Sequence, residues 1–284
     1  MFGAARTIAG LIGAAASHAS HDNIARMSAA LAYYALFALA PIIVIAMSVA
    51  SAAIGNIAAQ AQLRTELDLI AGPTLEAAIL RILASSHALG GSFATATGLC
   101  VLAFGGSGIF LELRESLDAI LGSRSARRKG LLRFIQMRTL AFAMVLVGST
   151  LLLAGMAASV AITGFINDAA SVFPTTSVLI VGLAGVVTLT ILAALLFALL
   201  YRQMPRPKPS WREAWAGAAV AACLFVAGEF GVSAYLGRVA PSSHLGTAGS
   251  VIALLIWIYY SAQSAYFGAE FSKAFGERFG LRTA

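Results

Sequence analysis

The sequence predicts an all-α membrane protein, a bundle of six transmembrane helices with both termini in the cytoplasm. Its composition and the placement of its basic residues indicate this fold. Apolar types make up 60% of the 284 residues and charged types only 11%, against about 45–50% and about 25% in soluble domains. So few charges cannot cover a folded surface with polar groups, so we expect lipid around the exterior.

Six segments are long and apolar enough to cross a bilayer, which takes about 20 mostly apolar residues in a helix. They cover residues 31–54, 92–111, 140–166, 177–201, 214–236 and 249–269. The runs lack the alternation of β-barrel strands, so we expect helices. The predicted parts of the chain are a cytoplasmic amphipathic segment (1–28), a six-span domain (29–272) and a cytoplasmic tail (273–284).

The basic residues give an independent indication of topology. With the N-terminus in the cytoplasm, every Lys and Arg falls on the cytoplasmic side except Arg64, Arg81 and Arg238. Basic residues collect in cytoplasmic loops of membrane proteins, and their alternation here fits an even number of spans. The net charge of +7 then reflects topology and contact with anionic lipid, and we expect no nucleic acid partner.

Two connecting segments stand out. Residues 62–89 on the extracytoplasmic side fit either two short amphipathic helices around Pro73 or an ordinary structured loop. The linker 202–210 contains Pro205, Pro207 and Pro209 among basic residues and separates two groups of three spans. Such a division is typical of inverted-repeat transporters, although the halves show no convincing sequence match.

Several residues within the spans are candidates for a transport path. Glu229 is an ionisable residue in the fifth span, where a charge is costly and needs a partner. It fits a proton- or cation-coupling carboxylate or a structural hydrogen bond. Tyr259, Gln263 and Tyr266 form a polar stripe at helical spacing in the sixth span. This stripe should face the interior, where it lines a path or holds helices together.

The first two spans add further candidates. Pro41 should kink the first span and free a backbone carbonyl. The small residues 105–108 fit either a broken helix or close packing. The candidate path residues are therefore Glu229, Tyr259, Gln263, Tyr266, Ser107, Gly105, Gly106, Pro41 and Tyr34.

Other ionisable residues suggest little chemistry. Glu270, at the cytoplasmic end of the sixth span, is expected to pair with Lys273 or Arg114 in a structural role. His18 and His21, with Asp22 nearby, are too few for a metal site. No P-loop, GxSxG or HExxH motif occurs, so we expect no enzyme activity, no metal and no cofactor. Cys100 and Cys223 lie in apolar runs and are expected to be buried.

The chain resembles the YihY/BrkB family, bacterial inner-membrane proteins with six predicted spans and a former ribonuclease BN label. The matching motifs lie at residues 29–41 (AALAYYALFALAP), 107–110 with Leu113, Leu117 and Ile120, 211–214 with 217–218, and 246–271. The sequence departs from the family at Leu245, where a tyrosine usually precedes the glycine, so no role of that tyrosine can be transferred. The resemblance implies a multi-pass protein of the bacterial inner membrane, and the residues do not support the ribonuclease label.

The sequence therefore predicts a transporter or permease for a small solute, an ion or a lipid component. The alternative is a non-transporting envelope scaffold or assembly factor, because tight helix packing also explains most of the small and polar residues. The expected partner is the lipid bilayer, and association between copies of the chain remains open.

Overall fold

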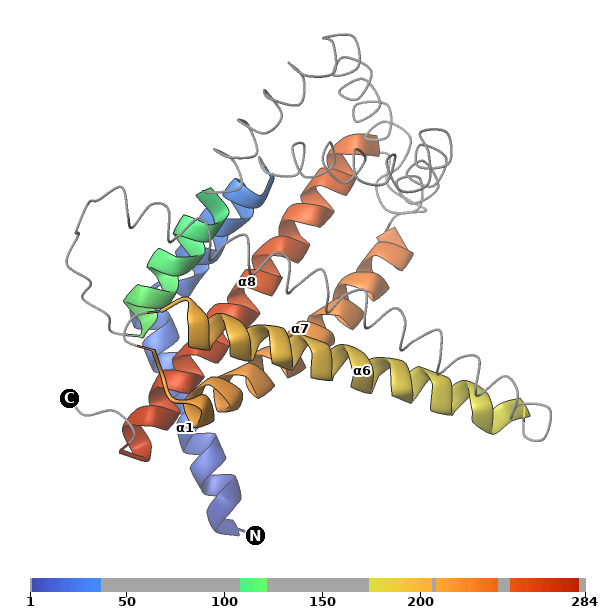
Figure 1. The fold of residues 1–284 in the computed structure, drawn as a ribbon. Coiled ribbons are helices and arrows are strands. Elements are labelled where there is room, and N and C mark those ends of the chain that lie inside the picture. The colour runs from blue at the N-terminus through green and yellow to red at the C-terminus, as the bar shows by residue number, and fades with distance from the viewer. Residues whose placement is uncertain (1, 37–107, 122–173, 206–207, 240–245, 281–284) are drawn as a thin grey trace, which may run out of the picture. The chain divides into compact units, whose positions relative to one another are not determined.

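The computed structural model describes residues 2–36, 108–121, 174–205, 208–239 and 246–280, and every regular element in these ranges is a helix (Figure 1). The helices are α1 (Phe2–His21), α6 (Pro174–Gln203), α7 (Trp211–Val239) and α8 (Gly246–Arg278), with further helical segments at residues 24–36 and 108–120. The all-α prediction is confirmed for this part of the chain. The predicted span 140–166, most of the first two spans and the loop 62–89 lie outside the described residues.

The chain divides into two compact units. The first comprises Met1–Ala25, Arg114–Phe230 and Gln263–Ala284, and the second comprises Arg26–Leu113 and Gly231–Ala262. Each unit contains residues from before and from after the proline-rich linker in the sequence. The units therefore do not coincide with the two groups of three spans that the linker separates in sequence.

Two of the described helices are long and apolar enough to cross a membrane, at Leu183–Gln203 in α6 and Trp211–Gly231 in α7. They overlap the predicted fourth and fifth spans. On α6, Leu183, Val187 and Ile191 recur every fourth residue and are all exposed. Such an exposed apolar stripe suits lipid contact rather than water contact.

Cys223 lies exposed on α7, so the expectation that it is buried is wrong. A helix surrounded by lipid can present an apolar residue on its outer surface without burying it in protein. An apolar sequence around a cysteine therefore predicts that the residue lies in the membrane, but it does not predict that the residue is buried within the protein.

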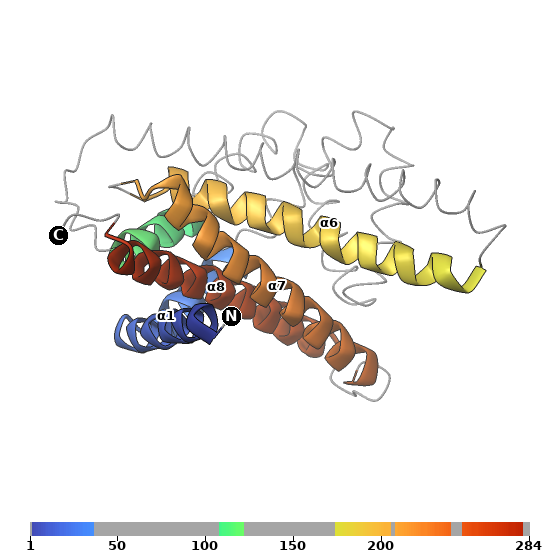
Figure 2. The same ribbon diagram turned by 90° about the horizontal axis from the view of Figure 1, so that it is seen from below.

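Glycines let α7 and α8 approach closely in the first unit, where the two helices lie side by side (Figure 2). A methyl group on Gly217 would lie 2.7 Å from the Cβ of Ser272, and one on Gly268 would lie 2.6 Å from the Cβ of Ala221. Real side chains do not tolerate such distances. Small residues at these positions bring the two backbones together, as in many membrane helix pairs.

The connection from α6 to α7 is held by polar contacts at both ends. Ser210 and Glu213 form a capping box: the Ser210 hydroxyl donates to Glu213 Oε1 at 2.7 Å, and the Glu213 amide donates to the Ser210 hydroxyl at 3.3 Å. Arg202 donates to the Pro209 carbonyl at 3.0 Å and lies 5.7 Å from the ring centre of Trp211. These contacts fix where α7 begins.

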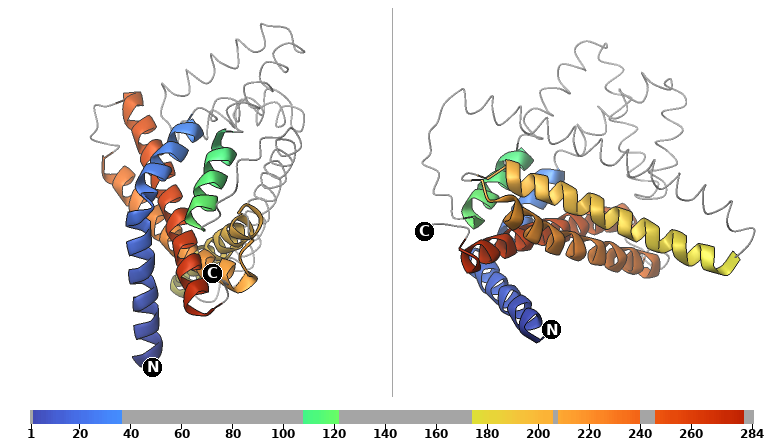
Figure 3. Two further views of the ribbon diagram at one scale, coloured as in Figure 1. Left: turned by 90° about the vertical axis from the view of Figure 1, so that its left-hand side faces the viewer. Right: turned by 60° about the horizontal axis from the view of Figure 1, so that its bottom comes forward.

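Helix α1 packs along the C-terminal part of α8 (Figure 3). Leu11 and Ala15, one turn apart on α1, form a buried apolar cluster with Phe271 and Ala274 of α8. The amphipathic character expected of the N-terminal segment thus places one apolar stripe against α8. The end of α1 is thereby brought to the polar residues of α8.

Candidate functional site

A line of polar side chains runs along α8. It contains the predicted Tyr259, Gln263 and Tyr266 and continues through Glu270 and Lys273. The five residues are separated by steps of four, three, four and three, so they share one face of a helix with 3.6 residues per turn. At 1.5 Å per residue this polar face of α8 is about 21 Å long.

The middle of the polar face is enclosed by protein. Tyr266 and Glu270 are fully buried, and Gln263 is partly buried. Buried residues also surround them on the other sides of α8, among them Ala262, Ala265 and Ala269. Most of the helix surface between Ala262 and Ala274 is thus buried, while Gln263, Phe267 and Lys273 are partly exposed.

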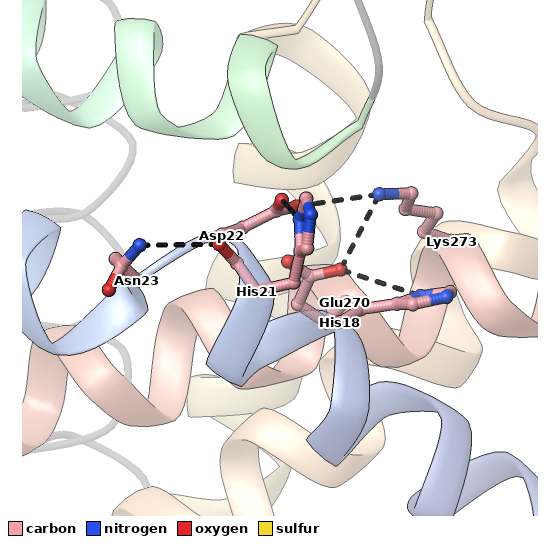
Figure 4. Close-up of polar contacts among 6 residues, drawn as sticks. All are labelled: His18, His21, Asp22, Asn23, Glu270 and Lys273. Atoms are coloured by element: carbon pink, nitrogen blue, oxygen red, sulfur yellow. Dashed lines mark hydrogen bonds and ion pairs between the residues drawn. The ribbon is translucent and has the colours of Figure 1, made fainter.

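Glu270 lies in a cluster of charged groups where α1 meets α8 (Figure 4). Its Oε2 atom is 3.9 Å from His18 Nδ1 and 3.9 Å from Lys273 Nζ. Lys273 Nζ lies closer to Asp22, at 3.5 Å from Oδ2. The expected pairing of Glu270 with Lys273 is present as a long contact. Arg114, the other expected partner, instead lies 3.6 Å from Asp118.

The turn after α1 holds Asp22 in place. Asn23 adopts a positive φ of 54°, a left-handed conformation that asparagine tolerates better than most residues. Its side chain donates to the His21 carbonyl at 3.2 Å, and His21 Nδ1 lies 3.1 Å from Asp22 Oδ1. Asp22 is therefore fixed beside Lys273 at the point where the chain leaves α1.

Glu270 and Asp22 differ in the pKa of their carboxyl groups. The pKa of Glu270 is raised from 4.5 to about 8, chiefly by burial; Lys273 opposes the rise, and the neighbouring Asp22 and Glu277 add to it. At Asp22, burial also favours the neutral acid, but His21, Glu270 and Lys273 outweigh it and hold the pKa below its usual value. At neutral pH Asp22 is therefore ionised and Glu270 is largely protonated.

A three-helix junction lies on the opposite side of α8. Tyr201 of α6 is fully buried, and its hydroxyl donates to the Ala265 carbonyl at 2.5 Å. The same hydroxyl would lie 2.6 Å from a methyl group on Gly268. Gly217, Gly268 and Tyr201 thus form the junction of α6, α7 and α8. This junction lies on the side of α8 opposite the polar face.

Of the other predicted path residues, the structure describes Glu229 and Tyr34. Glu229 lies partly buried on α7 within the first unit. Tyr34 belongs to the second unit, where its ring packs on Gly108: a methyl group there would lie 2.9 Å from the ring. Pro41, Gly105, Gly106 and Ser107 lie outside the described residues. The structure thus brings Tyr34 next to Gly108, the last member of the small-residue cluster.

Sequence reasoning missed Glu270 and Lys273 as members of the polar face, although the helical spacing of Tyr259, Gln263 and Tyr266 continues through both. It could not have found His18 and Asp22 as their neighbours. Asp22 and Lys273 are 251 residues apart in the chain, and the expected cytoplasmic segment showed no feature that pairs it with α8.

The charged cluster does not resemble a metal site. Within the described ranges no group of three or more His, Cys, Asp or Glu side chains could hold a metal ion. A lysine beside both carboxyl groups also competes with a cation for them.

The comparison with known proteins extends over nearly the whole chain. The family model described as virulence factor BrkB matches residues 15–283, which include His18, Asp22, α6, α7 and all of α8. No curated protein and no solved structure matches the chain. The resemblance found from the motifs is confirmed: the chain belongs to the BrkB virulence factor family, a family of membrane proteins.

Proposed function

We propose that this protein is a multi-pass transporter or permease of the bacterial inner membrane, which moves a small solute, an ion or a lipid component. The observation that supports this proposal best is the polar face of α8, with Tyr266 and Glu270 fully buried along it. Polar and ionisable groups are costly within a membrane protein and commonly mark substrate or ion pathways. Glu229 on α7 adds a second ionisable group to the same unit.

Helix packing alone explains some of the buried polar groups but not all of them. The capping box accounts for Glu213, and the bond to Ala265 accounts for Tyr201. Within the described part of the chain, neither carboxyl oxygen of Glu270 makes a hydrogen bond of standard geometry. A group retained only to hold helices together would be expected to make such bonds. This difference favours transport over the alternative of a non-transporting scaffold.

The proposal is tested by flux into liposomes that contain the full-length protein. The assay measures uptake of protons, alkali cations, small osmolytes and a fluorescent lipid analogue. We expect uptake of at least one of these above that of protein-free liposomes. Tyr266→Phe, Gln263→Leu and Glu229→Gln should each reduce this uptake several-fold, because the first two remove a polar group from the path and the third removes its ionisable carboxyl group.

Tyr260→Phe is the matched control, since Tyr260 lies about 100° around α8 from Tyr259 and so is off the polar face. Its uptake should equal that of the wild type. If the wild-type protein moves none of the probes, or if Tyr266→Phe and Tyr260→Phe behave alike, the transport proposal is wrong. A stable protein partner on purification would then favour the scaffold.

A further inference from the structure

We propose that Glu270, enclosed by α1 and α8 together with His18, Asp22 and Lys273, is a proton-binding site. The coupling ion of the transporter would then be a proton. Only this coupling role rests on the proposed function, because the site itself follows from the geometry of the cluster.

Within the described part of the chain, Lys273 is the one lysine or arginine within 4 Å of the two carboxyl groups of the cluster. Lys273 is shared between Asp22 and Glu270, at 3.5 Å and 3.9 Å, and it lies nearer to Asp22. The Glu270 side chain is completely inaccessible to solvent, and a buried carboxylate needs close pairing and hydrogen bonds to remain ionised. A bound proton removes this requirement, because the neutral acid carries no charge to be compensated.

Among the residues that the structure describes, the charged groups of the surrounding elements do not replace the missing cation. On α8 itself, Glu277 adds a further negative charge. Glu213 of α7 adjoins α8 at Gly276 but is bound by Ser210. Arg114 pairs with Asp118, and Arg278 lies beside Gly10 in the middle of α1. The raised pKa of Glu270 agrees with this geometry.

Two partly or largely exposed histidines lie in the cluster, one beside Glu270 and one beside Asp22. His18 Nδ1 lies 3.9 Å from Glu270, and a third of the His18 side chain is exposed (34%). His21, which contacts Asp22, is exposed over most of its side chain (89%). Imidazole side chains are common proton carriers near neutral pH. The predicted topology places this end of α8 at the cytoplasmic surface, so protons would be exchanged with the cytoplasm.

The site is tested by an infrared titration of the full-length protein in lipid nanodiscs, which follows the absorption of protonated carboxyl groups. The wild type should lose one such band with a midpoint near pH 8. Glu270→Gln should abolish this transition. Glu115→Gln, which removes an exposed glutamate of the same unit, should leave it unchanged.

Two further variants keep the test decisive if Glu270→Gln does not fold. Asp22→Asn removes a negative neighbour and should lower the midpoint, whereas Lys273→Met removes a positive neighbour and should raise it. General loosening of the structure would move both midpoints toward the ordinary glutamate value. Absence of a carboxyl transition near neutral pH, or shifts of the same sign in both variants, would overturn the proton site.

The titration and the flux assay fail independently. A Glu270 transition in a protein that moves no probe would retain the proton site and reject the transport function. Solute uptake that is independent of a pH gradient, in a protein without the transition, would retain transport and reject the proton site. When both proposals hold, Glu270→Gln should abolish the acceleration of uptake by a pH gradient, and Glu115→Gln should preserve it.

Discussion

Glu270 illustrates how the surroundings of one side chain decide its charge. Its carboxyl group is buried, the Lys273 ammonium is 3.9 Å away, and the closer contact of Lys273 goes to Asp22. Under these conditions protonation is less costly than ionisation. Asp22 has the same chemistry but is bound by His21 and Lys273 and remains ionised. Two carboxyl groups in one cluster are therefore separated in acidity by their partners.

The raised pKa of Glu270 predicts how stability depends on pH. The folded protein retains this proton up to about pH 8, whereas the unfolded chain loses it near the ordinary value of 4.5. Between these values the folded state binds more protons, so the contribution of Glu270 to stability is fully present below pH 4.5 and is lost as pH rises to about 8. Each pKa unit corresponds to about 1.4 kcal/mol, so the loss is on the order of a few kcal/mol.

The measurement is the thermal unfolding temperature in nanodiscs at pH 6 and pH 9. The wild type should lose more stability between these two pH values than Glu270→Gln, which carries no titrating group at this position. The difference between the two proteins isolates Glu270 from all other titrating groups. Equal losses in both would show that Glu270 does not hold a proton at neutral pH.

At this scale the sequence could predict the type of residue but not its neighbours. The spacing of Tyr259, Gln263 and Tyr266 could have been followed to Glu270 and Lys273, since periodicity is a property of the local sequence. The approach of His18 and Asp22 depends on how α1 packs, through Leu11 and Ala15 against Phe271 and Ala274. Such long-range packing between small and common apolar residues leaves no recognisable pattern in the sequence.

At the scale of elements, α8 combines two different faces. The polar face carries Tyr266 and Glu270, and roughly opposite it lie Gly268 and Ser272, where α7 approaches closely. The motifs at residues 211–218 and 246–271, which carried the family resemblance separately, therefore meet in space. Small residues on one side allow the polar residues on the other side to be held in a fixed position.

The close approach at Gly268 predicts a strong sensitivity to substitution. Gly268→Ala would place a methyl group 2.6 Å from Ala221 Cβ and from the Tyr201 hydroxyl, and 2.7 Å from the Gly217 carbonyl oxygen. The helices would have to separate, at a cost of about 1–3 kcal/mol. Gly231→Ala is the matched control, because nothing lies within 4 Å of its added methyl group and alanine favours a helix.

Both variants are compared by thermal unfolding in the same lipid. Gly268→Ala should unfold at a lower temperature than the wild type, and Gly231→Ala should match or exceed the wild type. If Gly268→Ala is as stable as Gly231→Ala, α7 and α8 do not approach as closely as the structure indicates.

At the scale of the whole molecule, composition and charge predicted more than local patterns could. The helical class was predictable because continuous apolar runs exclude alternating strands, and α6 and α7 contain helices long and apolar enough to span a membrane. Helix α8 is 33 residues long, enough to cross a bilayer. Its polar face makes it less apolar than α6 and α7, so its role as a span stays a prediction from topology.

Transport, and the coupling of transport to a proton, both require that the chain crosses the bilayer with the basic segments on one side. Cysteine labelling tests this most directly, in a chain with Cys100→Ala and Cys223→Ala and one new cysteine at a time. With a membrane-impermeant thiol reagent on intact cells, Ser242→Cys, between the predicted fifth and sixth spans, should be labelled. Ser125→Cys, within the basic segment 124–129, should be labelled only after the membrane is opened. Labelling of Ser125→Cys in intact cells, or of both positions alike, would contradict the six-span topology.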